Sequence, residues 1–277
     1  MSEAPVVLLF GASGPAGRAF IERTANQGVR VLAVSRNQPT RSLPHVTWLQ
    51  HDLSSGPVDV RASTLVSFGP LQFVLDQMDR TPFVGRIVAI STASTRFKRH
   101  SPDAGERARM AAIQAAEERL AAVSGQRNIV LTLIKPTLIY GGGDGNVDRV
   151  AELAKRLPWV PVAGHGLRAP VHADDLARLA HACLAVGGAS AGTWWLAGGE
   201  TLAYPDMVRR IAAARGRSVR VVVLPCWLLK IGLRIARLAG RLRDVTPVMI
   251  ERQRMDLVVD DQPARERLGW NPRPFRP

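Results

Sequence analysis

Cysteine is scarce in this chain, and its two residues lie far apart in the sequence. Cys183 and Cys226 stand in apolar surroundings and lack the short spacings of metal ligands. The sequence therefore predicts two reduced thiols in the core, no disulfide framework and no metal site. The first residues carry no basic segment and no cleavage-type site, and no apolar run requires a membrane. From this we expect a cytoplasmic protein.

Acidic residues are outnumbered, with 23 Asp and Glu against 37 Lys and Arg, a formal net charge of +14 and a pI near 11.3. Such a charge favours anionic partners. The basic residues are mostly arginines spread along the chain, with neither zinc-finger spacing nor an aromatic RNA-binding signature, so no nucleic-acid partner is expected. A hydrophobic fraction of 46% in 277 residues argues against a disordered or fibrous chain.

Strand and helix signals alternate through the first half of the chain, as in βαβ units. This alternation predicts the α/β class, with a Rossmann-type, doubly wound parallel sheet. The predicted strands cover residues 6–10, 29–34, 46–50, 64–67, 86–90 and 129–134, and the predicted helices cover residues 15–26, 103–123, 174–185 and 204–214. We expect residues 1–140 to form the dinucleotide-binding domain. Residues 141–277 would then form a smaller C-terminal substrate cap, partly interleaved with the sheet, with residues 268–274 extended over the surface.

A glycine-rich turn follows the first predicted strand directly and opens the first predicted helix. In such a turn the first glycine allows the tight bend, the second lets the backbone approach a pyrophosphate, and the third packs helix against strand. The helix N-terminus then faces the phosphate charge. The predicted dinucleotide contacts in this turn are Gly11, Ser13, Gly14, Pro15, Ala16 and Gly17.

The end of the second predicted strand carries no acidic residue. An NAD-specific site would place a carboxylate there to bind the ribose 2′-hydroxyl. The chain instead has Ser35 and Arg36, and an arginine can form charge-assisted hydrogen bonds with a 2′-phosphate. The sequence therefore favours NADPH over NADH, although a solvated surface arginine is the alternative.

Several further motifs resemble the extended and atypical branch of the short-chain dehydrogenase/reductase superfamily, the NAD-dependent epimerase/dehydratase type. They are the glycine-rich turn, Asp52-Leu53, the segment from Lys135 to Gly141, the segment from Arg168 to Asp175, and the segment from Leu268 to Pro272. The resemblance implies that Asp52, Leu53 and Ser91 contact the cofactor. It also implies that Tyr140 and Arg168 bind the substrate, with Arg168 holding a phosphate of a nucleotide-linked sugar. His172, Asp174 and Asp175 are expected to fix a turn and cap the following helix.

The catalytic Tyr-x-x-x-Lys of that superfamily is missing. With Glu117 taken as the acid that follows the family's lysine, the tyrosine position holds Arg109 and the lysine position holds Ile113; a shift of one residue gives Met110 and Gln114 instead. The remaining candidates for acid–base chemistry lie after the fifth predicted strand. They are Ser94 and Lys98, with His100 close by, although a lysine and a histidine in such a basic loop are more often solvated.

Residues 227–243 read as a basic amphipathic helix. Lys230, Arg234, Arg237 and Arg241 share one stripe, and apolar residues occupy the rest. The helix has too many cations to span a bilayer. Either its apolar side packs on the cap, or the helix makes peripheral contact with an anionic membrane, at the inner face for a cytoplasmic protein.

Two functions stay open. One is an NADP-linked oxidoreductase or epimerase-like enzyme acting on a small molecule, a nucleotide- or lipid-linked sugar. The other is a non-catalytic NADPH-binding sensor or scaffold protein, similar in that respect to the dehydrogenase-like accessory subunit of respiratory complex I. The second explains the missing tyrosine and lysine directly.

Overall fold

The fold is that of a computed structural model, which describes residues 6–25, 27–37, 43–80, 84–142, 145–238, 240–243 and 245–277. The side chains of Gly145, Asn146 and Arg156 are also outside the description. Three parts of the sequence predictions lie outside these residues: the segment 1–5, the predicted end of the first helix at Asn26, and Ala239 in the basic segment.

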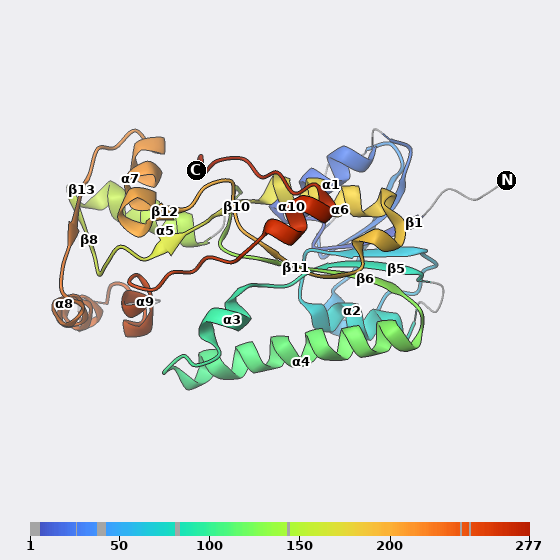
Figure 1. The fold of residues 1–277 in the computed structure, drawn as a ribbon, viewed down its shortest axis with the longest axis horizontal. Helices are drawn as coiled ribbons and strands as arrows, with labels where there is room; N and C mark the ends of the chain where they lie inside the picture. Colours follow the sequence, from blue (N-terminus) through green and yellow to red (C-terminus); the bar gives the residue numbers. More distant parts are fainter. Residues whose placement is uncertain are drawn as a thin grey trace.

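A seven-stranded parallel sheet forms the centre of the larger part of the molecule (Figure 1). Its strands are β1 (Val6–Phe10), β2 (Arg30–Ser35), β3 (Val46–Gln50), β4 (Thr64–Ser67), β5 (Arg86–Ile90), β6 (Val130–Pro136) and β11 (Gly192–Leu196). They lie in the order β11-β6-β5-β4-β1-β2-β3, and every pairing is parallel. The predicted Rossmann-type sheet is confirmed.

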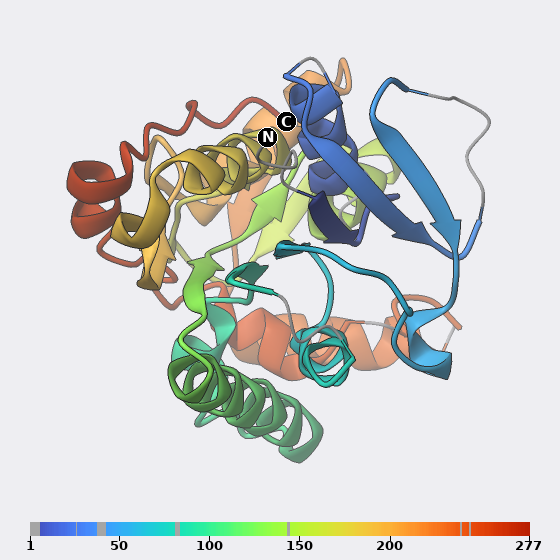
Figure 2. The ribbon, with the colours of Figure 1, turned by 90° about the vertical axis from the view of Figure 1, so that its right-hand side faces the viewer.

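Helices cover both faces of this sheet, as the apolar runs of its inner strands require (Figure 2). One face carries α1 (Pro15–Ala25), α6 (Ala173–Ala185) and α10 (Gln262–Leu268); the other carries α2 (Leu71–Met78) and α4 (Ala104–Gln126). Phe20 and Leu176 are buried in the core on the first side, and Leu75 and Leu120 in the core on the second. Because helices cover both faces, a ligand can reach the sheet at the carboxyl ends of its parallel strands.

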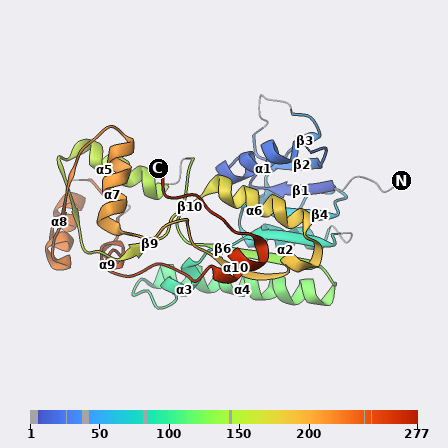
Figure 3. The same ribbon diagram turned by 45° about the horizontal axis from the view of Figure 1, so that its top comes forward.

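The smaller part of the molecule lies beyond one end of the sheet (Figure 3). Its elements are β7 (Ile139–Tyr140), α5 (Gly145–Arg156), β8 (Trp159–Val162), β9 (Leu167–Arg168), β10 (Val171–His172), β12 (Leu202–Ala203), α7 (Tyr204–Ala214), β13 (Arg220–Val223), α8 (Cys226–Leu238) and α9 (Pro247–Arg252). Three two-stranded pairs, β7 with β10, β9 with β12, and β8 with β13, connect these helices. None of the helices in the described ranges is long and apolar enough to cross a bilayer.

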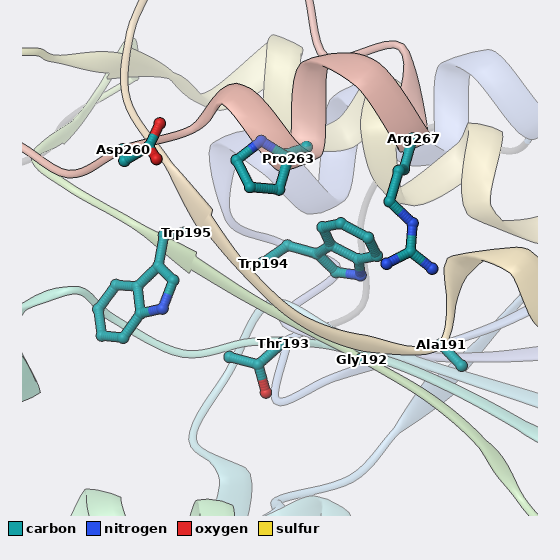
Figure 4. A pocket seen from close by; sticks show the side chains of 9 residues that line it. Ala191, Gly192, Thr193, Trp194, Trp195, Asp260, Pro263 and Arg267 are labelled. Carbon is teal, nitrogen blue, oxygen red and sulfur yellow. The ribbon is translucent and has the colours of Figure 1, made fainter.

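The chain returns from the smaller part to the sheet at β11, which pairs with β6 at the edge. Figure 4 shows Trp194 and Trp195 on opposite sides of this strand. Trp194 lies beneath α10 with the guanidinium of Arg267 5.1 Å from its ring centroid, while Trp195 lies 4.4 Å from the Lys135 ammonium. The small cavity beside them, about 230 Å³, belongs to this packing of α10 on the sheet edge.

The segment after α10 runs back along the junction of the two parts. Gly269 ends α10 with a left-handed φ of 64°, as a C-terminal glycine should. The Trp270 indole then donates to the Ala197 carbonyl at 2.9 Å. Arg273 donates from its backbone N–H to Asp175 at 3.0 Å, and its guanidinium also contacts both Asp174 and Asp175. This segment therefore fastens α6 to the smaller part.

The structure contains elements that the sequence did not predict and places the ends of others differently. The long helix begins at Ala104, one residue after its predicted start, because Asp103 caps it with a carboxylate that accepts from the Glu106 N–H at 2.8 Å. Helix α2 and strand β11 were not predicted, and helix α8 ends at Leu238, so residues 240–243 lie beyond it. Both cysteines are free; Cys183 is buried, which raises the pKa of its thiol to about 11, whereas Cys226 is only partly buried.

Candidate active site

The glycine-rich turn links β1 to α1, as the dinucleotide-binding prediction requires. Gly11 has a φ of 70°, and a Cβ atom there would lie 3.1 Å from the Phe68 carbonyl carbon. A Cβ atom on Gly17 would lie 2.8 Å from the Ala12 Cα and closer still to the Gly11 carbonyl oxygen. A side chain at the first glycine would be strained by its positive φ and tightly packed, and the third glycine has no room for one, which is the close helix–strand packing that a pyrophosphate turn needs.

The loop after β7 lies against this turn. A Cβ atom on Gly142, whose φ is 134°, would lie 2.6 Å from the Pro15 ring. Gly141 is equally tight, because a Cβ atom there would lie 2.7 Å from the His172 ring. The entry to the smaller part is thus packed directly on the start of α1.

The residues predicted to contact the adenine and ribose of the dinucleotide lie at and near the carboxyl end of β2. Ser35 is buried and accepts from the Asn37 N–H at 3.3 Å, whereas Arg36 is exposed. Asp52 caps a short 3₁₀ turn, Leu53–Ser55, by accepting from the Ser54 N–H at 3.0 Å. This backbone hydrogen bond, followed by one from the Ser54 hydroxyl, lowers the pKa of Asp52. The exposed Arg36 guanidinium is accordingly the positive group available at this edge.

A buried ion pair joins α4 to β6. The Lys135 ammonium lies 2.7 Å from the Glu117 carboxylate, and both side chains are 8% exposed. Ser91, which follows β5, donates its hydroxyl hydrogen bond to the other Glu117 oxygen. Glu117 therefore faces the sheet. Ile113, four residues earlier on the helix, is half-buried, and Arg109, eight residues earlier, is exposed.

A large cavity of about 1560 Å³ opens between the sheet edge and the smaller part. Its sheet-side wall comes from the segments after β5 and β6, including Thr92, Ser94, Lys98 and Thr137. Its far wall is largely apolar and comes mostly from α8, with Leu228, Leu229, Ile231, Leu233 and Ile235. Ile139 lines this cavity while Gly142, three residues on, packs against Pro15. The cavity and the glycine-rich turn are thus neighbours, where a substrate and a dinucleotide would meet.

Cations gather in the wall of the cavity. Lys98 lies 3.3 Å from Glu106, and Arg252 pairs with the other oxygen of the same carboxylate. Burial raises the pKa of Glu106, but the Ser101 hydroxyl, Lys98 and Arg252 outweigh it, so the pKa lies below its ordinary value. The ionised Glu106 thereby orients two cations toward one region.

Arg168 adds a third cation, and it is 5% exposed. Its guanidinium donates to the carbonyl oxygens of Leu167, Arg252 and Met255 at 2.7–2.8 Å, and it stands 5.2 Å from the Tyr204 ring centroid. Burial lowers the pKa of Arg168 to about 10. Among the residues that the structure describes, no carboxylate forms an ion pair with it; its charge is stabilised by the three carbonyl dipoles and by the nearby Asp256 carboxylate.

Tyr140 and His172, by contrast, are packed into the junction. The Tyr140 hydroxyl donates to the Pro274 carbonyl at 3.3 Å and accepts from the Arg276 N–H at 3.2 Å. Tyr140 is not among the cavity-lining residues, so its described role is to hold the C-terminal segment. His172 caps α6 through its ring nitrogen, which accepts from the Asp174 N–H at 3.1 Å. The cap is therefore the imidazole, and the two carboxylates bind arginines instead.

Of the acid–base candidates, Ser94 and Lys98 line the cavity. His100 is exposed and does not line it. The residues that the sequence prediction missed are Arg252 and the apolar face of α8, because each joins the cavity only through long-range packing. No cluster of three or more His, Cys, Asp or Glu suited to a metal occurs within the described parts of the chain.

No family model matches the sequence. A UDP-glucose 4-epimerase of Vibrio cholerae is 26% identical over 161 residues, which is 57% of this chain and 46% of that protein. The match therefore spans under half the length of this curated relative.

Solved structures align over nearly the whole chain. A UDP-N-acetylglucosamine 4-epimerase of Bacillus cereus superposes with a TM-score of 0.69 at 13% identity, covering 98% of this chain and 92% of that one. The UDP-glucuronic acid 4-epimerase of the same organism, solved with UDP-glucuronic acid and NAD, gives a TM-score of 0.67 at 13% identity, with 98% and 95% covered. The chain therefore shares the fold of these sugar-nucleotide epimerases, and part of its sequence is distantly similar to another epimerase.

Proposed function

We propose that the chain binds NADP(H) on the turn from Gly11 to Gly17 and acts as an epimerase- or dehydratase-like oxidoreductase on an anionic substrate. The observation that carries the proposal is the turn itself. It stands between a buried parallel strand and a helix, with a positive φ at Gly11 and no room for a side chain at Gly17. Backbone N–H groups and the positive end of α1 would hold the pyrophosphate.

The preference for NADP(H) rests on the end of β2. Ser35 and Arg36 stand where an NAD-specific site needs a carboxylate, and the exposed Arg36 is free to approach a 2′-phosphate from solvent. The UDP-glucuronic acid 4-epimerase of similar fold was solved with NAD. The proposed preference for NADP(H) therefore comes from the residues of this chain and not from that structure.

The anionic substrate is inferred from the cavity wall. Arg168 is a buried cation without a carboxylate partner among the described residues, and Lys98 and Arg252 share a single carboxylate. A phosphate is a suitable ligand for these cations, since guanidinium and phosphate match in geometry. A sugar linked to a nucleotide or lipid phosphate meets this requirement. Ser94 and Lys98 are the residues we propose for proton transfer there.

A non-catalytic role is the second candidate, and one specific observation favours it. The Glu117–Lys135 pair holds one face of α4 against the sheet. The positions where the resemblance implies tyrosine and lysine hold Arg109 and Ile113, or Met110 and Gln114 in the register shifted by one residue. Neither pair supplies the tyrosine and lysine that the resemblance implies for proton transfer. A sensor or scaffold would bind NADPH tightly and leave it unoxidised.

The deciding experiment is calorimetric titration with NADPH and NADH, followed by absorbance at the nicotinamide band with keto-sugar nucleotides. Tight NADPH binding with oxidation supports the enzyme. Tight binding without oxidation by these substrates supports the sensor or scaffold. Absence of binding to either dinucleotide contradicts both. As a control, the double variant Arg109→Tyr, Ile113→Lys should gain reductase activity if the rest of the site is intact.

A further inference from the structure

Helix α8 has two apolar sides, and only one of them is covered. Leu233 is buried against Ala163 and Ile250, with Leu229 and Cys226 packed beside it. Trp227, Ile231, Ile235 and Leu238 recur at intervals of four, four and three residues. At about 100° per residue they form a stripe on the side of the helix opposite Leu229 and Leu233.

This second stripe is strongly exposed. Trp227 is 64% exposed, Ile235 63% and Leu238 90%. Figures 1 and 3 show α8 at the end of the molecule farthest from the sheet. Soluble proteins rarely leave such a continuous apolar face bare without a partner for it.

Cations accompany the stripe, and carboxylates are missing from it. Between residues 220 and 243 the sequence contains six basic residues and no acidic one. Lys230 pairs with Glu251 and Arg237 donates to the Val245 carbonyl, so these two are held close to the body of the protein. Arg234 and Arg241 are exposed and form no ion pair with any residue in the described ranges. This charge pattern suits an anionic surface and opposes a cationic one.

We propose that α8 docks on the surface of an anionic lipid bilayer through Trp227, Ile231, Ile235 and Leu238, with Arg234 and Arg241 at the headgroups. The helix has 13 residues and is therefore about 20 Å long, which suits a helix lying in the interface. A tryptophan at one end of the stripe fits the same position, because indole rings favour the headgroup level.

The cavity gives this docking a consequence. Ile231 and Ile235 belong both to the exposed stripe and to the cavity wall. A bilayer against α8 would therefore cover apolar lining of the cavity, and an amphiphile could pass from the bilayer to the cations Arg168 and Arg252. This step rests on the proposed anionic substrate, whereas the docking itself does not.

Vesicle flotation of the full chain tests the docking. We expect binding to vesicles of equimolar phosphatidylcholine and phosphatidylglycerol, and at least about tenfold weaker binding to phosphatidylcholine alone. The double variant Arg234→Glu, Leu238→Glu should lose at least about tenfold in affinity for the mixed vesicles. Neither residue lines the cavity, so dinucleotide binding should stay unchanged and would separate a failure of docking from a failure of the proposed function.

A matched control makes the same change of charge elsewhere. The double variant Arg119→Glu, Val186→Glu also replaces one exposed arginine and one exposed apolar residue, on α4 and at the end of α6. It should float like the unmodified chain. Equal loss in both variants, or no binding to mixed vesicles by the unmodified chain, overturns the proposal. A dimer that the Leu238→Glu change dissociates, without vesicle binding, would assign the stripe to a second copy and also overturn it.

Tryptophan fluorescence gives an independent measurement. Trp227 should shift its emission to shorter wavelength when mixed vesicles are added, and the shift should vanish in Trp227→Phe, which keeps the apolar contact. An unchanged shift in that variant would show that another surface meets the lipid, contrary to the proposal.

Discussion

Lys135 on β6 holds its ammonium nitrogen 2.7 Å from a carboxylate oxygen of Glu117 on α4, in a site where both side chains are nearly inaccessible to solvent. Ser91 donates to the second carboxylate oxygen, and the Trp195 ring lies 4.4 Å from the ammonium. The pair therefore fixes the rotation of α4 against the sheet.

Breaking this pair from one side should be costly. Lys135→Met leaves the buried Glu117 carboxylate without its counter-ion and should lower the free energy of unfolding by about 3–5 kcal/mol. The double variant Lys135→Met, Glu117→Gln leaves no uncompensated charge and should be clearly more stable than Lys135→Met. Urea unfolding of both variants measures the difference. Equal stabilities would show that the two charges are not coupled.

Gly17 should not tolerate even a methyl group. In Gly17→Ala the new Cβ atom meets the Gly11 carbonyl oxygen and lies 2.8 Å from the Ala12 Cα, so the turn must open and dinucleotide binding should fall below detection in calorimetry. Gly85→Ala is the control, because nothing lies within 4 Å of its added Cβ atom. Unchanged NADPH affinity in Gly17→Ala would refute the assignment of the turn.

Arg36 should set the choice between the two dinucleotides. Arg36→Ser removes charge-assisted hydrogen bonds worth about 1.5–3 kcal/mol each, so NADPH affinity should fall by about tenfold to a hundredfold while NADH affinity changes little. Arg30→Ser, at the opposite end of β2 and equally exposed, should leave both affinities as they are. Titration calorimetry decides; parallel losses for NADPH and NADH would remove Arg36 from the 2′-phosphate site.

Acidification should weaken the fold through His172. Burial and then the nearby Arg273 charge lower the pKa of this histidine, and its ring nitrogen must stay unprotonated to cap α6. As the pH falls, this histidine is therefore protonated in the unfolded state before it is protonated in the folded state. Its contribution to the stability of the fold is complete above about pH 6.5 and is lost as the pH falls through the lowered pKa.

The variant His172→Asn keeps a cap acceptor but cannot titrate. Its thermal midpoint should depend less on pH between neutrality and mild acid than that of the unmodified chain. Some dependence should remain, because burial and Arg23 also lower the pKa of His181. Identical pH profiles for the variant and the unmodified chain would contradict the role of His172.

The Rossmann half of the fold could be predicted because its signals are local. Runs such as Val6–Phe10 are apolar throughout, as strands buried on both faces must be, and the glycine-rich turn marks the first strand–helix junction. Strand β11 was missed because Gly192–Leu196 has a glycine and two tryptophans and joins the sheet only by pairing with β6, some sixty residues earlier in the sequence. Its position at the edge is set by tertiary contacts.

The candidate site was predicted only in its local parts. The turn, Ser94, Lys98 and Arg168 could be named from motifs, whereas Arg252 enters the cavity through its pair with Glu106, 146 residues away in the sequence. Tyr140 matches a family motif, yet its hydroxyl is taken up by the backbone of Pro274 and Arg276. A motif gives the residue type at a position, but burial and partners depend on segments that no motif contains.

The contact between Arg273 and Asp175 also bears on how the chain is made. Asp175 is fully buried, and a ribosome synthesises it 98 residues before Arg273. During that interval the carboxylate has its partner on the same helix, Arg178, which is itself half exposed. Desolvating Asp175 before Arg273 emerges would be unfavourable, so α6 should dock firmly only afterwards. The nascent chain should thus hold all seven strands of its sheet with one loosely covered face, open to chaperones, until the Arg273 segment leaves the exit tunnel.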